Sequence, residues 1–310
     1  CYVARLYGVR SAMPMFKALE LCPKAQVVAP NMRKYRETSM IIRQAMLEFT
    51  HNIQPLSLDE AYLDLSNVQA EFALAPAQAL NLLLARIESR AGVSASAGLS
   101  YNKFLAKTAS DIDKPKGYFV INAQDAKAFL APRDIASMRG VGKATTKRLL
   151  RLGIETIGDL QQWERADLAA RFGIFGNQLY DFAHAIDHRP VCEAAKSKSI
   201  SAETTFFRDR ASPQELLESL IPLLETVVRR LQRQKARART VTVKLRTVDF
   251  QIHTRSRSLR GVSDNFEQFR DIVLNILEKI DIAGPYRLAG VGLSGLQSAH
   301  EEQNLLLWQE

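Results

Sequence analysis

The chain has 310 residues, enough for two or three domains, and its 46% apolar and 24% charged residues are typical of a soluble globular protein. No apolar run approaches the roughly 20 residues that span a bilayer, which argues against a membrane protein. The three cysteines form no zinc or disulfide pattern, which favours the cytoplasm. The net charge of +9 indicates a polyanionic partner.

The first 122 residues mix strand and helix patterns. We expect a hairpin from strands at 53–58 and 61–66, a helix at 76–90, a strand at 93–100, a helix at 101–112 and a strand at 117–122. These elements predict an α+β unit built around one sheet.

Two adjacent carboxylates, Asp59 and Glu60, interrupt the apolar alternation of PLSLDEAYLDLS at 55–66. Neighbours in a regular strand point to opposite faces, so both acids can serve one site only where the backbone bends. We therefore predict a hairpin with the acids at its tip. An ordinary solvated turn explains the two acids equally well, because acidic residues are common in turns.

From 123 to 187 the pattern becomes helical, and its clearest signal is RGVGKATTKRLLRLG. Gly140 and Gly142 flank a tight turn before a helix, the pattern of a helix-hairpin-helix. In such a motif backbone N–H groups approach a DNA phosphate, and here Lys143 and Lys147 add positive charge. A purely structural turn is the alternative. The glycines of RFGIFG, further along, are interpreted as helix caps.

After a tether at 192–201, the patterns from 202 to 296 follow the order βαββαβ. This order suits a ferredoxin-like domain with both helices on one face of a four-stranded sheet. Pro222 lies inside the first of these helices, at 212–236, and is expected to kink or break it.

Basic residues alternate on two strands of this domain: Lys244 and Arg246 on one, and Arg255 and Arg257 on the next. Alternation places each pair on one sheet face, and we expect all four on the face that the helices leave open. Repulsion among them favours contact with a nucleic-acid backbone, without sequence readout, over a solvated face.

Three further side chains could bind phosphate: Tyr2, Arg5 and Lys114. A tyrosine hydroxyl, an arginine and a lysine that converge would suit a triphosphate. Their spacing does not show that they converge.

Four segments in this order, YGVRSAMP, SLDEAYLD, SAGLSYNKFLAKTASDIDKPKG and GVGKATTKRL, resemble the Y-family translesion DNA polymerases, especially the bacterial DNA polymerase IV group, over essentially the whole chain. The resemblance implies a multidomain right-hand polymerase that copies damaged DNA with low fidelity and without proofreading, as a cytoplasmic monomer in DNA repair. Its implied layout is partial fingers at 1–30, a partial palm at 31–122, a helix-hairpin-helix thumb at 123–187, a linker at 188–200, a little finger at 201–295 and a tail at 296–310.

The resemblance also implies a metal site. Asp59 would bridge two Mg²⁺ ions and Glu60 would bind the ion that activates the primer 3′-hydroxyl for attack on a dNTP. Mg²⁺ prefers oxygen ligands, and two such ions can stabilise the attacking and leaving oxygens of a phosphoryl transfer.

The family's nucleotide site carries over in the same way. Tyr2, Arg5 and Lys114 match residues that hold the dNTP triphosphate. Ser11 and Ala12 fall where the fingers present small side chains over the nascent base pair, which implies a roomy, lesion-tolerant site.

The sequence departs from the family pattern at two points. The family carries a further metal-binding aspartate and an aromatic gate against ribonucleotides in a strand upstream of Tyr2, so we expect the 310-residue chain to be inactive without that aspartate. Arg139 stands where relatives often have proline before the hairpin.

The tail EEQNLLLWQE contains Gln303, Leu306 and Trp308 in a Gln-x-x-Leu-x-aromatic series. It looks like the glutamine-led peptide with which DNA polymerase IV proteins bind the sliding clamp. A frayed apolar end packed on the preceding domain is the alternative.

Two other functions stay open: a non-catalytic Y-family accessory protein, and a plain helix-hairpin-helix DNA-binding protein. The retained Asp59, Glu60 and Lys114 argue against the first. The second leaves SLDEAYLD and DKPKG unexplained.

Overall fold

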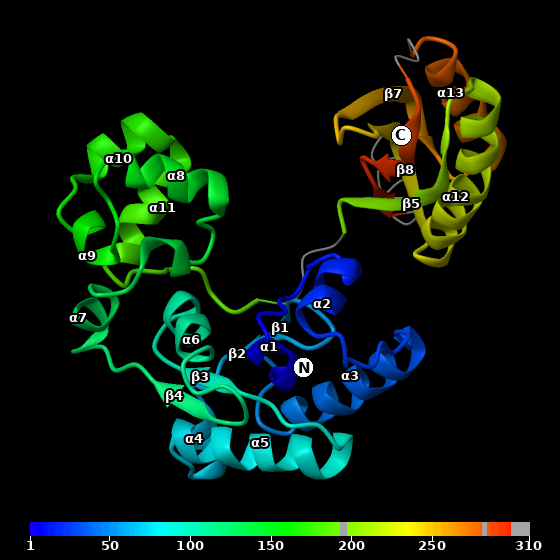
Figure 1. Ribbon diagram of the computed structural model, residues 1–310. Coiled ribbons are helices and arrows are strands. Elements are labelled where there is room, and N and C mark those ends of the chain that lie inside the picture. The colour runs from blue at the N-terminus through cyan, green and yellow to red at the C-terminus, as the bar shows by residue number, and fades with distance from the viewer. Residues whose placement is uncertain (193–196, 281–283, 299–310) are drawn as a thin grey trace, which may run out of the picture. The chain divides into compact units, whose positions relative to one another are not determined.

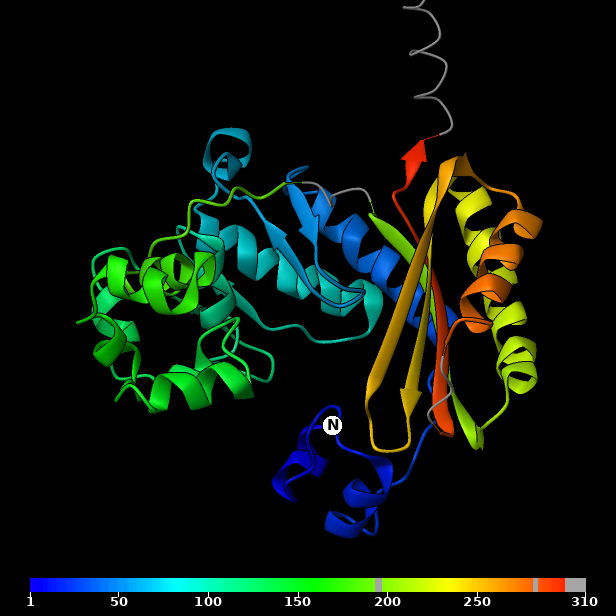
Figure 2. The same cartoon turned by 90° about the horizontal axis from the view of Figure 1, so that it is seen from above.

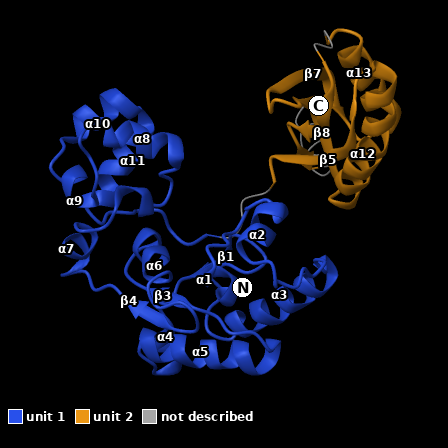
Figure 3. Ribbon diagram, viewed as in Figure 1, with its two compact units in different colours: residues 1–194 blue, residues 195–310 orange. Residues whose placement is uncertain are grey.

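The computed structural model describes residues 1–192, 197–280 and 284–298, within two compact units at 1–194 and 195–310 (Figure 1, Figure 3). Each unit has its own hydrophobic core. In the described part of the chain, no helix combines the length and the apolar character that crossing a membrane requires.

The first unit begins with α1 (Tyr2–Leu6), α2 (Met15–Leu21) and α3 (Met32–Leu47). The side-chain oxygen of Asn31 accepts a hydrogen bond from the Lys34 N–H and so caps the start of α3. Two further helices follow in this region, α4 (Val68–Phe72) and α5 (Pro76–Ala91). α3 and α5 pack together over a core of Ala45, Phe49, Val68, Ala79, Leu83 and Ile87.

The strands of the first unit are short and form two separate pairs. β1 (Ile53–Pro55) and β2 (Ala61–Leu63) are antiparallel, and β3 (Ala97–Leu99) and β4 (Tyr118–Val120) are parallel. The prediction of one sheet is therefore wrong for the described residues, which form two two-stranded sheets. Period-two alternation predicts that a strand exists but does not specify its partner, so it could not distinguish one sheet from two.

The second half of this unit is helical and has its own core. Its elements are α6 (Lys103–Ala109), α7 (Ala126–Leu130), the 3₁₀ turn Ile135–Ser137, α8 (Lys143–Leu150), α9 (Ile157–Leu160), α10 (Arg165–Phe172) and α11 (Ile174–Ala183). Gly173, with φ of 63°, ends α10 and begins α11, as expected of a helix cap. A Cβ on Gly176 would lie 2.1 Å from the Leu168 carbonyl oxygen, so glycine lets α11 pack closely on α10.

The second unit has the predicted βαββαβ order. Its elements are β5 (Ser199–Arg210), α12 (Pro213–Arg233), β6 (Ala236–Thr247), β7 (Ile252–Ser263), α13 (Phe266–Leu277) and β8 (Tyr286–Ser294), and β9 (Gln297–Ser298) adds a short pairing to β6. Figure 2 shows both helices on one face of the sheet, as predicted.

The strand order of this sheet is β5-β8-β6-β7, with every neighbouring pair antiparallel. This differs from a ferredoxin-like sheet, in which the first strand has an inner position. Here the last strand, β8, has an inner position and the first strand, β5, lies at the edge. Most of β8 is accordingly buried, whereas β5 is mostly exposed.

Pro222 does not break α12, which runs continuously over 21 residues. Its buried face packs on the sheet through Leu216, Leu220, Leu224, Val227, Val228 and Leu231. Burial of six such side chains contributes about 9–18 kcal/mol, at roughly 1.5–3 kcal/mol each, which exceeds the roughly 3 kcal/mol that an interior proline costs. Packing thus overrides the local helix-breaking tendency that the sequence indicated.

Candidate active site and nucleic-acid contacts

The two adjacent acids lie in the loop between β1 and β2, which confirms the predicted hairpin. The N–H groups of Leu56 and Ser57 donate to the carbonyl oxygen of Glu60, at 2.8 and 3.2 Å, and so close the loop. The Ser57 hydroxyl donates to Asp59 Oδ1 at 2.6 Å, which holds that exposed carboxylate beside Glu60.

Glu60 is held differently, by a lysine of α6. Lys107 Nζ lies 2.8 Å from Glu60 Oε1, an ion pair whose angles are not those of a hydrogen bond. That oxygen is shielded from solvent and has no hydrogen-bond donor among the described residues. Beyond Lys107 the chain of charges continues through Asp111, which is 3.9 Å from Lys107 and also pairs with Lys114.

Two adjacent carboxylates, one of them paired here with Lys107, supply oxygen ligands of the kind that a hard cation such as Mg²⁺ prefers. Asp59 and Glu60 therefore fit as two ligands of such an ion. The described residues contain no group of three or more histidine, cysteine, aspartate or glutamate side chains that could hold a metal ion.

Lysines of α6 hold the hairpin from one side. Lys103 is 8% exposed, and its Nζ donates to Gln54 Oε1 at 2.8 Å and to the Pro190 carbonyl at 2.6 Å. It also lies 5.6 Å from the ring centre of Tyr62. Lys107 is one turn further on and reaches Glu60. Sequence reasoning missed both lysines, although their i, i+4 spacing in NKFLAK places them on one helix face.

Tyr62 connects the hairpin to the helical half of the unit. Its hydroxyl accepts a hydrogen bond from Arg139 Nη1 at 2.7 Å, and the Arg139 guanidinium carbon lies 5.7 Å from the ring centre. Burial raises the pKa of Tyr62, and the positive charge of Arg139 opposes that rise. The tyrosine is therefore neutral at physiological pH and serves as the acceptor.

A second connection runs through Asp187, whose side chain is 2% exposed. Arg189 binds it through Nε at 2.7 Å and Nη2 at 2.8 Å, and the Phe104 N–H donates to Oδ2 at 3.0 Å. Burial alone raises the pKa of this carboxyl, but the hydrogen bonds from Arg189 and Phe104 outweigh burial and the pKa is lowered. Asp187 thus fixes the start of α6 to the segment after α11.

The residues expected to hold a triphosphate partly converge. A cavity of about 540 Å³ is lined by Tyr2, Arg5, Arg10 and Pro115, together with Val3 and Leu6. Lys114 is the neighbour of Pro115 in the sequence but does not line the cavity, and its amino group pairs with Asp111.

Of the two small residues, Ser11 accepts a 3.4 Å hydrogen bond from Arg5, and Ala12 has a positive φ of 63°. Both are exposed in the turn between α1 and α2. Ser11 thus lies beside Arg5, which lines the cavity.

The glycine loop before α8 has the geometry of an anion site. Gly140 has φ of 93°, and Gly142, in extended conformation, begins the helix without a side-chain cap. A Cβ on Gly142 would meet nothing within 4 Å, so the approach to the first N–H groups of α8 is open. Lys143 and Lys147 are exposed on this helix.

The four predicted cations of the second unit do not share one face. Arg255 pairs across the ladder with Val243, and Arg257 pairs with Val241, and both valines are fully buried against the helices. Lys244 alternates with these valines and lies on the open face. Residues directly opposite in an antiparallel pair point the same way, so Arg255 and Arg257 lie on the helix side of the edge strand β7. The prediction of one four-cation patch is wrong.

The open face is instead formed mainly by hydroxyl groups and glycine. Hydroxyls bond across the ladder between Thr240 and Ser258, and between Thr242 and Ser256, both at 2.8 Å. Lys244 is paired with Glu203 at 2.7 Å. This face also carries Ser199, Ser201, Thr205, Arg246, Ile252, Thr254, Leu288, Gly290, Gly292 and Ser294. A Cβ on Gly290 would lie 2.8 Å from the Glu203 Cβ, so the ion pair needs glycine beneath it.

The residues of the clamp-binding prediction, Gln303, Leu306 and Trp308, lie outside the described residues.

Three family models match the chain. The impB/mucB/samB family model matches residues 1–111, the DNA polymerase-iota thumb domain model matches residues 136–187, and the C-terminal domain model of the impB/mucB/samB family matches residues 197–306. These ranges contain the hairpin with the acids, the glycine loop and the sheet of the second unit.

Similar proteins cover nearly the whole chain. DNA polymerase IV 1 of Mesorhizobium japonicum is 44% identical over 296 residues, which are 96% of this chain and 68% of that protein. DNA polymerase IV of Caulobacter vibrioides is 42% identical over 95% of this chain and 73% of its own length. DNA polymerase IV of Halorhodospira halophila is 42% identical over 98% of this chain and 85% of its own length.

Solved structures agree on the fold. A Y-family DNA polymerase chimera of Dbh and Dpo4 superimposes with a TM-score of 0.83 at 24% identity, covering 96% of this chain and 86% of that chain. An insertion ternary complex of Dbh DNA polymerase gives a TM-score of 0.65 at 25% identity with the same coverage. These matches confirm the predicted α+β polymerase fold. The chain therefore belongs to the Y-family of DNA polymerases, in the DNA polymerase IV group.

Proposed function

We propose that this protein is a DNA-directed DNA polymerase that extends a primer past damaged bases in its template. The observation that carries the proposal is the 40–44% identity to proteins named DNA polymerase IV over 95–98% of the chain. The adjacent acids at the hairpin tip, the open glycine loop and the basic balance of the chain support it.

Divalent metal dependence follows from the family in general, and we assign Asp59 and Glu60 as the chain's Mg²⁺ ligands. Bound Mg²⁺ would neutralise charge on the triphosphate and the developing 3′-oxygen. The chain's own part is to hold both carboxylates on one closed loop, with Ser57 bonded to Asp59 and Lys107 paired with Glu60. The other ligands of a second ion would come from substrate oxygens or from residues other than Asp59 and Glu60.

The incoming dNTP is assigned to the cavity beside α1. Arg5 and Arg10 supply two guanidinium groups, which suit phosphate oxygens, and Tyr2 supplies a hydroxyl. Lys114 is close in sequence to Pro115 in the cavity wall, so exchange of Asp111 for a triphosphate would bring its charge to the site. Ser11 and Ala12 would then cover the nascent base pair with little bulk.

Primer-template DNA is assigned to the glycine loop and to the second unit. Gly140, Gly142, Lys143 and Lys147 would bind backbone phosphate at the start of α8, without sequence readout. In the second unit, Lys244 and Arg246 of the open face, and Arg255 and Arg257 of the opposite face, remain candidate phosphate contacts on two different surfaces.

The remaining assignments follow the family layout. They are fingers at 1–30, palm at 31–122, thumb at 123–187, linker at 188–200, little finger at 201–295, a clamp-binding tail at 296–310, a cytoplasmic location and a monomeric state.

Primer extension by the full-length gene product tests the function. We expect Mg²⁺-dependent addition of dNMP units on an intact template and on one with an abasic site. Asp59→Ala or Glu60→Ala should abolish extension and leave DNA binding within a few fold, because other surfaces make the phosphate contacts. Glu71→Gln, an exposed acid on α4, is the matched control.

Two results would count against these assignments. No extension by the wild-type product overturns the polymerase. Substantial extension by either alanine variant overturns the assignment of the acids as metal ligands. The polymerase assignment would then stand, with other residues as the metal ligands.

A further inference from the structure

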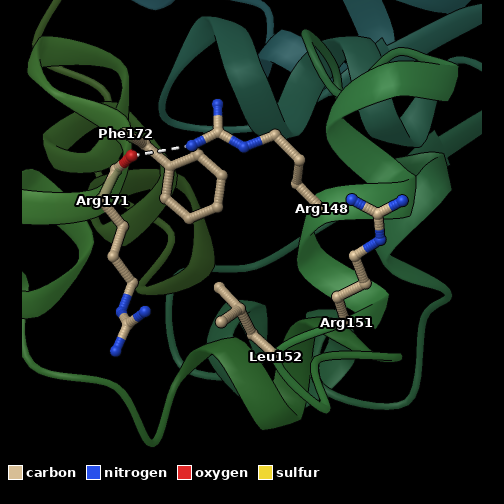
Figure 4. A pocket seen from close by; sticks show the side chains of 5 residues that line it. All are labelled: Arg148, Arg151, Leu152, Arg171 and Phe172. Carbon is tan, nitrogen blue, oxygen red and sulfur yellow. Dashed lines mark hydrogen bonds between the residues drawn. The ribbon is translucent and has the colours of Figure 1, made fainter.

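A basic pocket lies between the ends of α8 and α10, away from the glycine loop. It has a volume of about 280 Å³ and is lined by Arg148, Arg151, Leu152, Arg171 and Phe172. Figure 4 shows Arg148 extending across this space to Phe172, with Arg151 on one side of it and Arg171 on the other. The site described above uses none of these residues.

One of the three arginines is held in place before any ligand arrives. Arg148 Nη2 donates to the Arg171 carbonyl oxygen at 2.8 Å, and its guanidinium carbon lies 4.5 Å from the centre of the Phe172 ring (Figure 4). A planar group fixed by a hydrogen bond and by an aromatic ring loses little freedom when it binds a ligand. Its other N–H groups stay free to donate.

The positive charge of the pocket lies at the C-terminal ends of α8 and α10, and the Arg171 guanidinium carbon also lies 5.4 Å from the centre of the Trp163 ring. No carboxylate of the described residues neutralises it. Other arginines of this unit pair with acids, for example Arg165 with Asp181 and Arg86 with Glu48. In the described part of the chain, Arg148, Arg151 and Arg171 have no carboxylate within ion-pair distance. Three like charges around one cavity repel one another, and an anion in the cavity would relieve that repulsion.

We propose that this pocket binds a phosphate group of the DNA backbone, as a second contact on the helical half of the first unit. The guanidinium fork matches phosphate oxygens in pairs, and Leu152 with Phe172 offers apolar contact to the adjoining sugar. The proposal rests on the proposed function, because it takes DNA as the partner.

The position of the pocket on α8 favours DNA over a free phosphate or an acidic peptide. α8 begins at the glycine loop and has eight residues, so the pocket is roughly 12 Å along the same helix. A DNA strand presents a phosphate about every 3.4 Å of axis. A strand held at the loop with its axis along α8 would therefore offer another phosphate to the pocket about three or four nucleotides on.

Binding of a fluorescent primer-template by the full chain, measured against salt concentration, tests the proposal. The variant is Arg151→Gln with Arg171→Gln, which removes two charges and keeps the Arg148 hydrogen bond to the backbone. The control is Arg36→Gln with Arg43→Gln, two exposed arginines of α3. Loss of one phosphate contact lowers the slope of log K against log salt by about 0.9, which is about eightfold in affinity at 0.1 M salt.

We expect that loss for the pocket variant, an unchanged slope for the control and an unchanged melting temperature for both. Equal slopes for the two variants overturn the proposal. A second arm titrates inorganic pyrophosphate by calorimetry: binding that disappears in the pocket variant while the DNA slope stays unchanged assigns the pocket to a free phosphate and also overturns it. Failure of the wild-type chain to bind DNA at all would instead reject the proposed function.

Discussion

Arg139 Nη1 donates a hydrogen bond of 2.7 Å to the hydroxyl of Tyr62, across 77 positions of sequence. Arg139 directly precedes Gly140 of the glycine loop, and Tyr62 follows Glu60 by two positions on β2. The bond therefore ties the loop assigned to DNA phosphate to the hairpin that carries the acids, at the position where relatives often have proline.

A double-mutant cycle measures this connection. Tyr62→Phe should lower the free energy of unfolding by about 1 kcal/mol, because it removes the acceptor and keeps the ring. Arg139→Ala should cost at least as much, because it also removes the guanidinium from the ring, 5.7 Å away. The double variant should cost about as much as Arg139→Ala alone. Tyr35→Phe, an exposed tyrosine of α3, is the control. Strictly additive losses would show that the bond contributes nothing to stability.

Asp187→Ala should destabilise the first unit. The change removes the acceptor of four hydrogen bonds, three from Arg189 and one from the Phe104 N–H, and leaves that N–H without its partner. We expect a loss of about 1–3 kcal/mol, or roughly 3–10 °C in melting temperature at neutral pH. Glu155→Ala, an exposed acid, should change little.

The same variant predicts a pH dependence. The pKa of Asp187 is lowered in the folded protein, so its stabilising effect is complete above its ordinary pKa of 3.8 and is lost as the pH falls through the lower folded value. The difference in melting temperature between the wild type and Asp187→Ala should therefore narrow below about pH 4. A constant difference down to pH 2 would contradict the lowered pKa.

The two faces of the second unit can be separated by charge removal. If the open face meets DNA, Lys244→Gln with Arg246→Gln should flatten the slope of log K against log salt, whereas Arg255→Gln with Arg257→Gln should leave it nearly unchanged. DNA binding measured by anisotropy between about 0.05 and 0.2 M salt decides this. A larger change of slope in the variant at Arg255 and Arg257 would instead assign the DNA contact to the edge strand β7.

Glu203→Gln should strengthen DNA binding. Glu203 neutralises Lys244 at 2.7 Å, so its removal frees a cation on the open face. We expect a gain of a few fold at about 0.1 M salt and a steeper salt dependence. The variant Glu203→Gln with Lys244→Gln should lose that gain, and a gain that persists there would point to a general effect of net charge.

Deletion of residues 303–310 tests the tail. A short peptide of this kind should bind a clamp at around micromolar affinity, about −8 kcal/mol, which is sufficient when the clamp is threaded on the same DNA. The variant that lacks these residues should lose clamp binding and clamp-stimulated synthesis. Its primer extension without the clamp should stay unchanged. A melting temperature lowered by several degrees would show instead that the tail packs on the second unit.

Local patterns predicted the elements of this protein better than their arrangement. The hairpin with Asp59 and Glu60 at its tip follows from a strand pattern broken by two acids, and the glycine loop follows from Gly140 and Gly142 before a helix. The packing of Pro222 inside a continuous helix did not follow, because six buried side chains of α12 outweigh a local preference.

The faces of strands and the contacts of lysines also lay beyond sequence patterns. Alternation tells which residues of one strand share a face, but only the pairing register tells which face that is, and a shift of one residue exchanges the two. Arg255 opposite Val243 is therefore visible only in the ladder. Lys103 and Lys107 were missed because their partners come from a hairpin about fifty positions away.

The open face of the second unit has one more consequence. Its rows repeat short hydroxyl side chains beside glycines, as at Thr242, Ser256 and Gly292, and the longer Glu203, Lys244 and Arg246 side chains stand further along the same face. If primer-template DNA lies on this face, as proposed above, a strand that advances by one repeat would exchange each hydrogen bond for an equivalent one. The energy would then stay nearly level along the direction of travel, and the face would keep contact with a moving strand without fixing its position.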